Sequence, residues 1–172
     1  MFQAPPVDDA ARRRVYHEWL RQHAEIFFKV GRAYARTAED QEDLIQDILL
    51  QVWRSVPAFR GEASESTWLY RIALNVAIKW RKKENRRLRE TERAPILLPG
   101  RTYQHPQLEW LYRAIQGLPK IDRSLILLHL DGFPHAEIGD IIGMTTTNVG
   151  TRLHRIKQQL AEAARQTRAH EL

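Results

Sequence analysis

Residues 134–160, PHAEIGDIIGMTTTNVGTRLHRIKQQL, decide the fold of the C-terminal part of this chain. Their apolar side chains recur at helical spacing, which predicts a short helix, a turn at Gly143 and a longer second helix. The residues expected to form the buried faces are Ile138, Ile141, Ile142, Val149, Leu153, Ile156 and Leu160. Two helices joined in this way are typical of a helix-turn-helix, whose second helix enters the major groove of DNA.

The outer face of the second predicted helix carries side chains that can bind base edges or phosphates. The candidates are Thr147, Asn148, Thr151, Arg152 and Arg155. The alternative is a helical hairpin that only packs, because helix-turn-helix patterns also occur in proteins that do not bind DNA.

Charge is distributed unevenly along the 172 residues, whose formal net charge is +6. Residues 79–93 hold eight basic and three acidic side chains, whereas residues 37–53 hold five acidic side chains and no basic one. The basic run favours a polyanionic partner, and the acidic segment favours a basic one. We therefore expect two opposed electrostatic faces on one chain.

Several classes of protein are disfavoured by the composition. The chain has no cysteine, which excludes disulfides and thiol chemistry. No apolar run approaches the roughly 20 residues that span a bilayer, and the N-terminus lacks the apolar core of a signal peptide, so we expect a cytoplasmic protein without membrane insertion. The histidines lack metal-ligand spacing and no phosphate-binding or nucleophile motif is present, so neither an enzyme nor a cofactor or metal site is expected.

The rest of the chain predicts an all-α fold with two small helical domains. One or two helices are expected over residues 9–36, and another over residues 39–56, which Thr37 would cap and Pro57 would end. A third helix would start near Ser66, after a loop, and would bury Trp68, Leu69, Ile72, Ala73, Val76 and Trp80. Residues 94–107 have the composition of a flexible linker, and helices over 108–116 and 120–131 would follow it, with Gly132 as a stop.

Two blocks of sequence resemble the extracytoplasmic-function (ECF) sigma factors, bacterial members of the sigma-70 family. EDLIQDILLQVWRSVPAFRG (residues 42–61), followed by STWLYRIALNVAIKWRKKENRR (residues 66–87), is similar to sigma region 2. Residues 118–160 are similar to sigma region 4. The resemblance implies a region 2 domain over residues 9–93, the linker over 94–107 and a region 4 domain over 108–172. It also implies a role in promoter-specific transcription initiation.

For region 2, the resemblance implies that an acidic helix face binds core RNA polymerase at the clamp helices of the β′ subunit. The residues that correspond to this face are Asp43, Leu44, Gln46 and Asp47. An ordinary solvated helix face is the alternative on charge alone.

The resemblance also places recognition of the melted minus-10 element on the loop and the third helix of region 2. The corresponding residues are Phe59, Arg60, Ser64, Arg71, Asn75 and Lys79. Asn75 is the strongest candidate, because asparagine can bind a base edge with two hydrogen bonds and is unfavourable inside a helix without such a use. Trp68 and Trp80 lie on the apolar stripe, so we expect them to pack in the core rather than to stack on bases.

For region 4, the resemblance implies that the outer face of the second helix contacts the minus-35 duplex and that the domain binds the β flap of polymerase. Gly150 departs from the family, because many relatives have a lysine or arginine there. An anti-sigma factor is the regulator that the family implies. The rival hypothesis is a stand-alone helix-turn-helix regulator, which would normally dimerise on paired half-sites.

Overall fold

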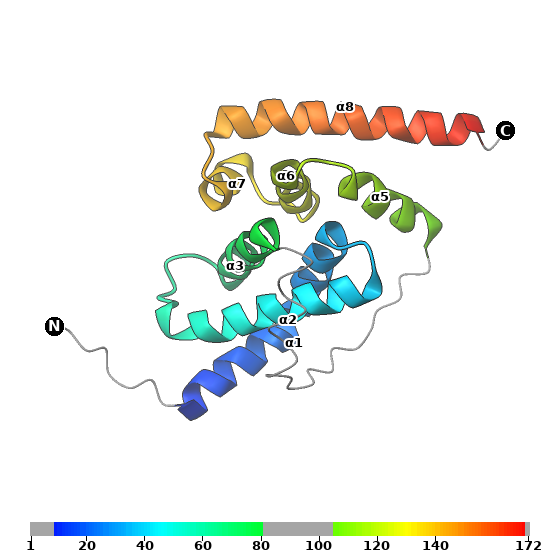
Figure 1. The fold of residues 1–172 in the computed structure, drawn as a ribbon. Helices are drawn as coiled ribbons and strands as arrows, with labels where there is room; N and C mark the ends of the chain where they lie inside the picture. The colour runs from blue at the N-terminus through cyan, green and yellow to red at the C-terminus, as the bar shows by residue number, and fades with distance from the viewer. Residues whose placement is uncertain (1–8, 81–104, 171–172) are drawn as a thin grey trace.

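The computed structural model describes residues 9–80 and 105–170, and over these residues it contains helices and loops but no strand. The all-α class predicted from the sequence is confirmed. The helices form an N-terminal lobe (residues 9–80) and a C-terminal lobe (residues 105–170), which lie against each other (Figure 1). None of the helices in these ranges is long and apolar enough to span a bilayer.

The N-terminal lobe is built from three packed helices and one short 3-10 turn. These are α1 (Asp9–Tyr34), α2 (Ala38–Ser55), η1 (Val56–Ala58) and α3 (Glu65–Lys79). A kink at His23 divides α1 into two segments. As predicted, Thr37 caps α2, its hydroxyl accepting a hydrogen bond from the backbone N–H of Asp40 at 3.1 Å. Pro57 lies in η1, directly after the end of α2.

The C-terminal lobe contains the helix-turn-helix. Its helices are α5 (Pro106–Gln116), α6 (Lys120–Leu130), α7 (His135–Ile142) and α8 (Thr146–His170). Gly143 ends α7 with φ = 82°, a left-handed conformation that favours glycine, and Gly132 has φ = 84° after α6. Pro134 occupies the N-cap of α7. α5 begins inside the predicted linker; most of that linker and the basic run beyond Trp80 lie outside the described residues.

The apolar positions predicted for the helix-turn-helix form its core. Ile138, Val149 and Leu153 are completely buried, and Ile156 nearly so. Ile142 and Leu160 pack against this core with part of their surface exposed. The helical spacing of apolar residues in the sequence therefore identified the buried faces of α7 and α8 correctly.

The prediction for α3 was incomplete, because this helix is buried on two sides. Leu69 and Ala73 are buried as expected, whereas Trp68, Ile72, Val76 and Trp80 are only partly buried. Tyr70, Leu74 and Ala77, which were not predicted, are almost fully buried as well. The reason is tertiary: α3 packs on α1 and α2 and also contacts α6 and α7 of the other lobe.

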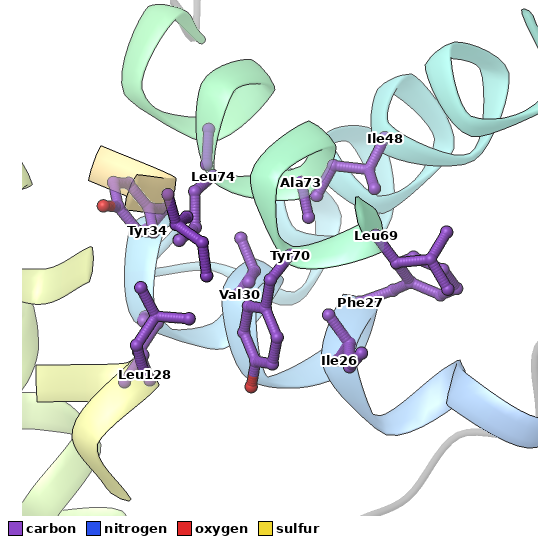
Figure 2. Close-up of a cluster of buried hydrophobic side chains, with 14 of the residues drawn as sticks. Ile26, Phe27, Val30, Tyr34, Ile48, Leu69, Tyr70, Ala73, Leu74 and Leu128 are labelled. Atoms are coloured by element: carbon purple, nitrogen blue, oxygen red, sulfur yellow. The ribbon is translucent and has the colours of Figure 1, made fainter. Parts of the chain in front are cut away.

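A single cluster of buried side chains runs through both lobes. Figure 2 shows Leu128 of α6 near Tyr34 of α1 and Leu74 of α3, and all three belong to this cluster. The lobes are thus held together by a shared apolar core.

Candidate nucleic-acid interface

A pocket of about 650 Å³ opens where the loop before α3 meets the C-terminal lobe. Four of the six residues predicted to contact melted DNA line it: Phe59, Arg60, Ser64 and Arg71. The other lining residues are Ala58, Glu62, Ala63, Thr67, Trp68, Glu137 and Asp140. The loop and α3 therefore bring separate parts of the predicted site to one concave surface.

Aromatic rings form one wall of this pocket. Phe59 packs edge-on against Trp19, with ring centroids 5.2 Å apart, and lies 5.6 Å from Trp68. Trp68 was expected in the core, and it does pack on the core, but part of its surface also lines the pocket. Such a wall offers apolar contact to an unstacked base.

Ser64 has a structural role besides its place in the pocket. It caps α3, with its hydroxyl accepting a hydrogen bond from the backbone N–H of Thr67 at 3.1 Å. Gly61, at φ = 72°, allows the loop to turn before that cap. The local sequence thus fixes where the loop ends and which way α3 leaves it.

Asn75 and Lys79 lie further along α3 and do not line the pocket. Both are exposed, and a spacing of four residues places them on the same face of the helix. An exposed Asn within a helix satisfies no core contact.

Two acidic residues of the C-terminal lobe were missed by the sequence reasoning. Glu137 and Asp140, both on α7, line the pocket from the opposite side. The hydroxyl of Thr67 donates a hydrogen bond to the Glu137 carboxylate, and the Arg71 guanidinium lies 3.5 Å from the backbone carbonyl of Asp140. No sequence signal could have shown this, because it depends on how the lobes meet.

The outer face of α8 carries most of the predicted duplex contacts. Thr147, Asn148, Thr151 and Arg155 are exposed near its N-terminal end. The hydroxyl of Thr145 accepts a hydrogen bond from the backbone N–H of Asn148 at 3.3 Å, which stabilises the first turn. This end of the helix is therefore capped and exposed on its outer face.

Arg152 differs from the other four, because it is held by α6. Its Nε and Nη2 atoms lie 2.9 Å and 2.8 Å from Oδ1 of Asp122. The Arg152 side chain is 40% exposed and the Asp122 side chain 14%. The sequence predicted that Arg152 lies on the exposed face of the helix, whereas in the structure its guanidinium is held by the half-buried carboxylate of Asp122.

Gly150 faces the start of α7. A Cβ atom at this position would meet Nδ1 of His135 at 3.5 Å, an ordinary contact, so packing does not require glycine here. The ring of His135 lies 6.1 Å from that of His129. Burial, together with the charge of Lys157 and the nearby His135, lowers the pKa of His129 and favours its neutral form at pH 7.

The acidic segment of α2 presents fewer surface groups than its sequence suggests. Asp40 and Leu44 are buried, so neither side chain is open to a partner. Asp43, Gln46 and Asp47 are half-buried, and Glu39 and Glu42 are exposed. Leu44 can support this face from below but does not reach its surface.

The part of the chain that the structure describes contains no group of three metal-ligating side chains that could hold a metal ion. Its notable surfaces are the pocket, the outer face of α8 and the acidic face of α2.

Comparison with known proteins finds a family match for each lobe. The family model for sigma-70 region 2 matches residues 12–87, and that for sigma-70 region 4 matches residues 108–160. The chain is 30% identical over 152 residues to the ECF RNA polymerase sigma factor SigX of Bacillus subtilis, covering 81% of this chain and 75% of SigX. It is 27% identical over 157 residues to SigM of Mycobacterium tuberculosis, covering 88% and 78% of the two chains.

Two solved structures share the fold. CnrH, solved with the cytosolic domain of CnrY, superposes with a TM-score of 0.64 at 19% identity, covering 88% of each chain. RpoE of Bartonella quintana, solved with the anti-sigma factor NepR, gives a TM-score of 0.68 at 20% identity, covering 89% of this chain and 98% of RpoE.

With one sigma-70 region matched to each lobe, the fold is that of a two-lobed DNA-binding transcription factor. The chain belongs to the sigma-70 family and is an ECF sigma factor. Its function is therefore promoter-specific transcription initiation with RNA polymerase.

Proposed function

We propose that the pocket and α3 hold the melted minus-10 strand while the outer face of α8 binds the minus-35 duplex. The observation that carries this assignment is the convergence of Phe59, Arg60, Ser64 and Arg71 on one aromatic-walled pocket. Asn75 and Lys79 extend the same surface along α3. Lys79 and the guanidinium groups of Arg60 and Arg71 supply positive charge for the phosphate backbone.

On α8, the exposed residues Thr147, Asn148, Thr151 and Arg155 would contact base edges and phosphates. Arg152 would act from a fixed position, because Asp122 restricts its guanidinium to one direction. A preoriented guanidinium loses less side-chain entropy on binding than a free one.

Core RNA polymerase would bind the acidic face of α2, with Asp43, Gln46 and Asp47 at its surface and Leu44 beneath them. The region 4 lobe would bind the β flap. Complementary charge at such a face raises the association rate and suppresses wrong partners more than it adds affinity. The cytoplasm, where polymerase acts, is the compartment that this function requires.

An anti-sigma factor is the regulator that we infer for this chain. CnrH was solved with the cytosolic domain of CnrY, and RpoE of Bartonella quintana with the anti-sigma factor NepR. Both resemble this chain across both lobes, so a partner of the same class has equivalent surfaces available here.

Run-off transcription tests the proposal. Bacterial core polymerase with a promoter library should yield specific products only when this chain is added, and the chain alone should bind promoter duplex poorly. Binding of a palindromic duplex by a dimer, without specific products from core polymerase, would instead support a stand-alone regulator.

A further inference from the structure

Two histidine rings lie close together where α6, α7 and α8 meet. His129 is in the last turn of α6 and His135 is the first residue of α7. Their ring centroids are 6.1 Å apart, and both residues are half-buried. The third helix approaches the pair at Gly150, where a Cβ would lie 3.5 Å from Nδ1 of His135. The pair therefore lies against the helix that carries the predicted duplex contacts.

A lysine of α8 adds positive charge beside this pair. Lys157 is exposed, and it follows Gly150 by seven residues, or about two turns, on the same flank of the helix. Burial, the charge of Lys157 and the nearby His135 all lower the pKa of His129. A proton on His129 would thus add charge to a region that already holds a cation. We call His129, His135 and Lys157 the histidine cluster.

The carboxylates on the neighbouring elements have other partners. Asp131, two residues after His129, accepts a hydrogen bond from Nζ of Lys29 on α1 at 2.8 Å. Glu137 on α7 accepts a hydrogen bond from the hydroxyl of Thr67 on α3. Within residues 9–80 and 105–170, no carboxylate forms an ion pair with the histidine cluster. The charge of the cluster is therefore available to an anion from outside.

The histidine cluster flanks the face of α8 that the proposed function places in the major groove. Thr147, Thr151 and Arg155 are exposed on that face, whereas Gly150 and Lys157 lie at its edge beside α7. In a helix-turn-helix, the first helix crosses the DNA backbone. Because α7 is the first helix here, the cluster would face phosphates rather than base edges.

Protons and phosphate would bind this cluster cooperatively. A phosphate beside Lys157 offsets the charge that disfavours protonation of His129, so the DNA complex would hold more protons than the free protein. By linkage, such a complex forms more tightly as the pH falls. Histidine is the side chain whose charge ordinarily changes between about pH 5 and 8, so the effect would fall within that range.

We propose that the histidine cluster is a phosphate-binding site of the minus-35 contact whose strength depends on its protonation. Acidification would then raise the affinity for duplex DNA through two residues that lie outside the predicted duplex-contact set. The proposal rests on the proposed function of α8, and it adds a second binding surface beside it.

Duplex binding by the full chain tests the proposal, because phosphate contacts carry no sequence information. The probe is a rhodamine-labelled duplex of about 20 base pairs and mixed sequence, followed by fluorescence anisotropy over a series of KCl concentrations. Affinity should rise from about pH 8 to about pH 6, and the salt slope of binding should increase by about one unit, as expected for one added phosphate contact. The same affinity and slope at both pH values would overturn the proposal.

Single substitutions separate the histidine cluster from other histidines. His129→Gln and His135→Gln should each lose at least half of the pH-dependent gain in affinity, while circular dichroism should show unchanged helix content. His17→Gln is the matched control, because His17 is exposed on α1 in the other lobe, and it should keep the full gain. His154 is exposed on α8 itself. Loss of the gain in His154→Gln, with the gain retained in His135→Gln, would overturn the proposal.

A measurement on the unsubstituted protein does not depend on how a variant folds. NMR of isotope-labelled histidine rings should show that His129 titrates at higher pH when the duplex is present. Lys157→Gln leaves both rings in place, and it should raise the pKa of His129 in the free protein and reduce the further rise on DNA binding. An unchanged titration of His129 on addition of the duplex would refute the site. Failure of the proposed function would appear separately, as absence of specific run-off products with core polymerase.

Discussion

Asp122 fixes the orientation of the Arg152 guanidinium. Because its carboxylate holds both Nε and Nη2, the guanidinium has one preferred direction in which it could approach DNA in the proposed complex. An arginine with free rotamers would bind phosphates without discrimination, whereas a fixed one can select a base edge. If Arg152 contacts the minus-35 duplex as proposed, Asp122 would influence that contact without touching DNA itself.

Asp122→Ala should reduce discrimination between the cognate minus-35 duplex and a scrambled duplex. We expect about a fivefold loss, equivalent to about 1 kcal/mol. Because the pair is partly exposed, the free energy of unfolding should fall by no more than about 1 kcal/mol. Anisotropy at fixed salt on the promoter identified by run-off measures the first effect, and urea unfolding the second. Glu162→Ala is the control, and unchanged discrimination would contradict a positioning role.

Asn75→Ala should impair promoter opening more than initial binding, because the proposed contact of the amide with a base could form only after the bases unstack. Permanganate footprinting with core polymerase should show weaker reactivity at the minus-10 element, while closed-complex affinity changes less than about threefold, or 0.7 kcal/mol.

Lys79→Ala is the matched variant for Asn75→Ala on the same exposed face. Loss of one phosphate contact should weaken binding to all sequences and reduce the salt slope by about one unit. Normal melting by Asn75→Ala would refute the base contact of Asn75.

Among the elements, the two helices of the helix-turn-helix use glycine in different ways. Gly139 on α7 lies against the turn, where a Cβ would come within 2.5 Å of the backbone carbonyl oxygen of Met144. Gly150 on α8 has room for a methyl group. Only the first glycine is required by packing.

Gly150→Ala should therefore stabilise the C-terminal lobe by about 1 kcal/mol, through the better helix propensity of alanine. Gly139→Ala, the matched substitution on the preceding helix, should destabilise it by about 1–3 kcal/mol, because backbone atoms must shift. Thermal unfolding followed by circular dichroism measures both. A loss of stability in Gly150→Ala would show a constraint on this residue that the packing does not reveal. Minus-35 affinity, measured in parallel, tests whether DNA requires a close approach at Gly150.

At the scale of the whole molecule, two buried tyrosines between the lobes should make the free energy of unfolding fall at alkaline pH. Burial raises the pKa of Tyr34 to about 12, from an ordinary value near 10 in the unfolded chain. The pKa of Tyr70 is raised as well, also mainly by burial. Between pH 10 and 12 the unfolded chain binds fewer protons than the folded one, so stability falls as pH rises.

We expect unfolding free energy to be constant near neutral pH and to fall through pH 10–12 by about 2 kcal/mol from Tyr34 alone. Urea unfolding across this range measures it. Tyr34→Phe should be less stable at pH 7, because its hydrogen bonds are lost, but should show a shallower alkaline decline. An identical decline in parent and variant would exclude Tyr34 as a source.

The sequence alone determined the local features of this protein. Helical periods identified the inner faces of α7 and α8, Thr37 and Gly143 marked helix ends, and the order of the two blocks indicated the family. These features depend on neighbours within a few residues, so they can be recognised in a linear string. Four members of the predicted minus-10 set proved to line one pocket for the same reason, since they share one loop and one helix.

The docking of the lobes was decided only by the tertiary structure. The second buried face of α3, the ion pair between Lys29 and Asp131, and the acidic wall of the pocket all join residues more than 40 positions apart. Such contacts depend on the complementarity of two folded surfaces. The spacing of apolar residues and motifs along the sequence does not specify that complementarity. For the same reason, the sequence could place Arg152 on a helix face but could not show that Asp122 holds it.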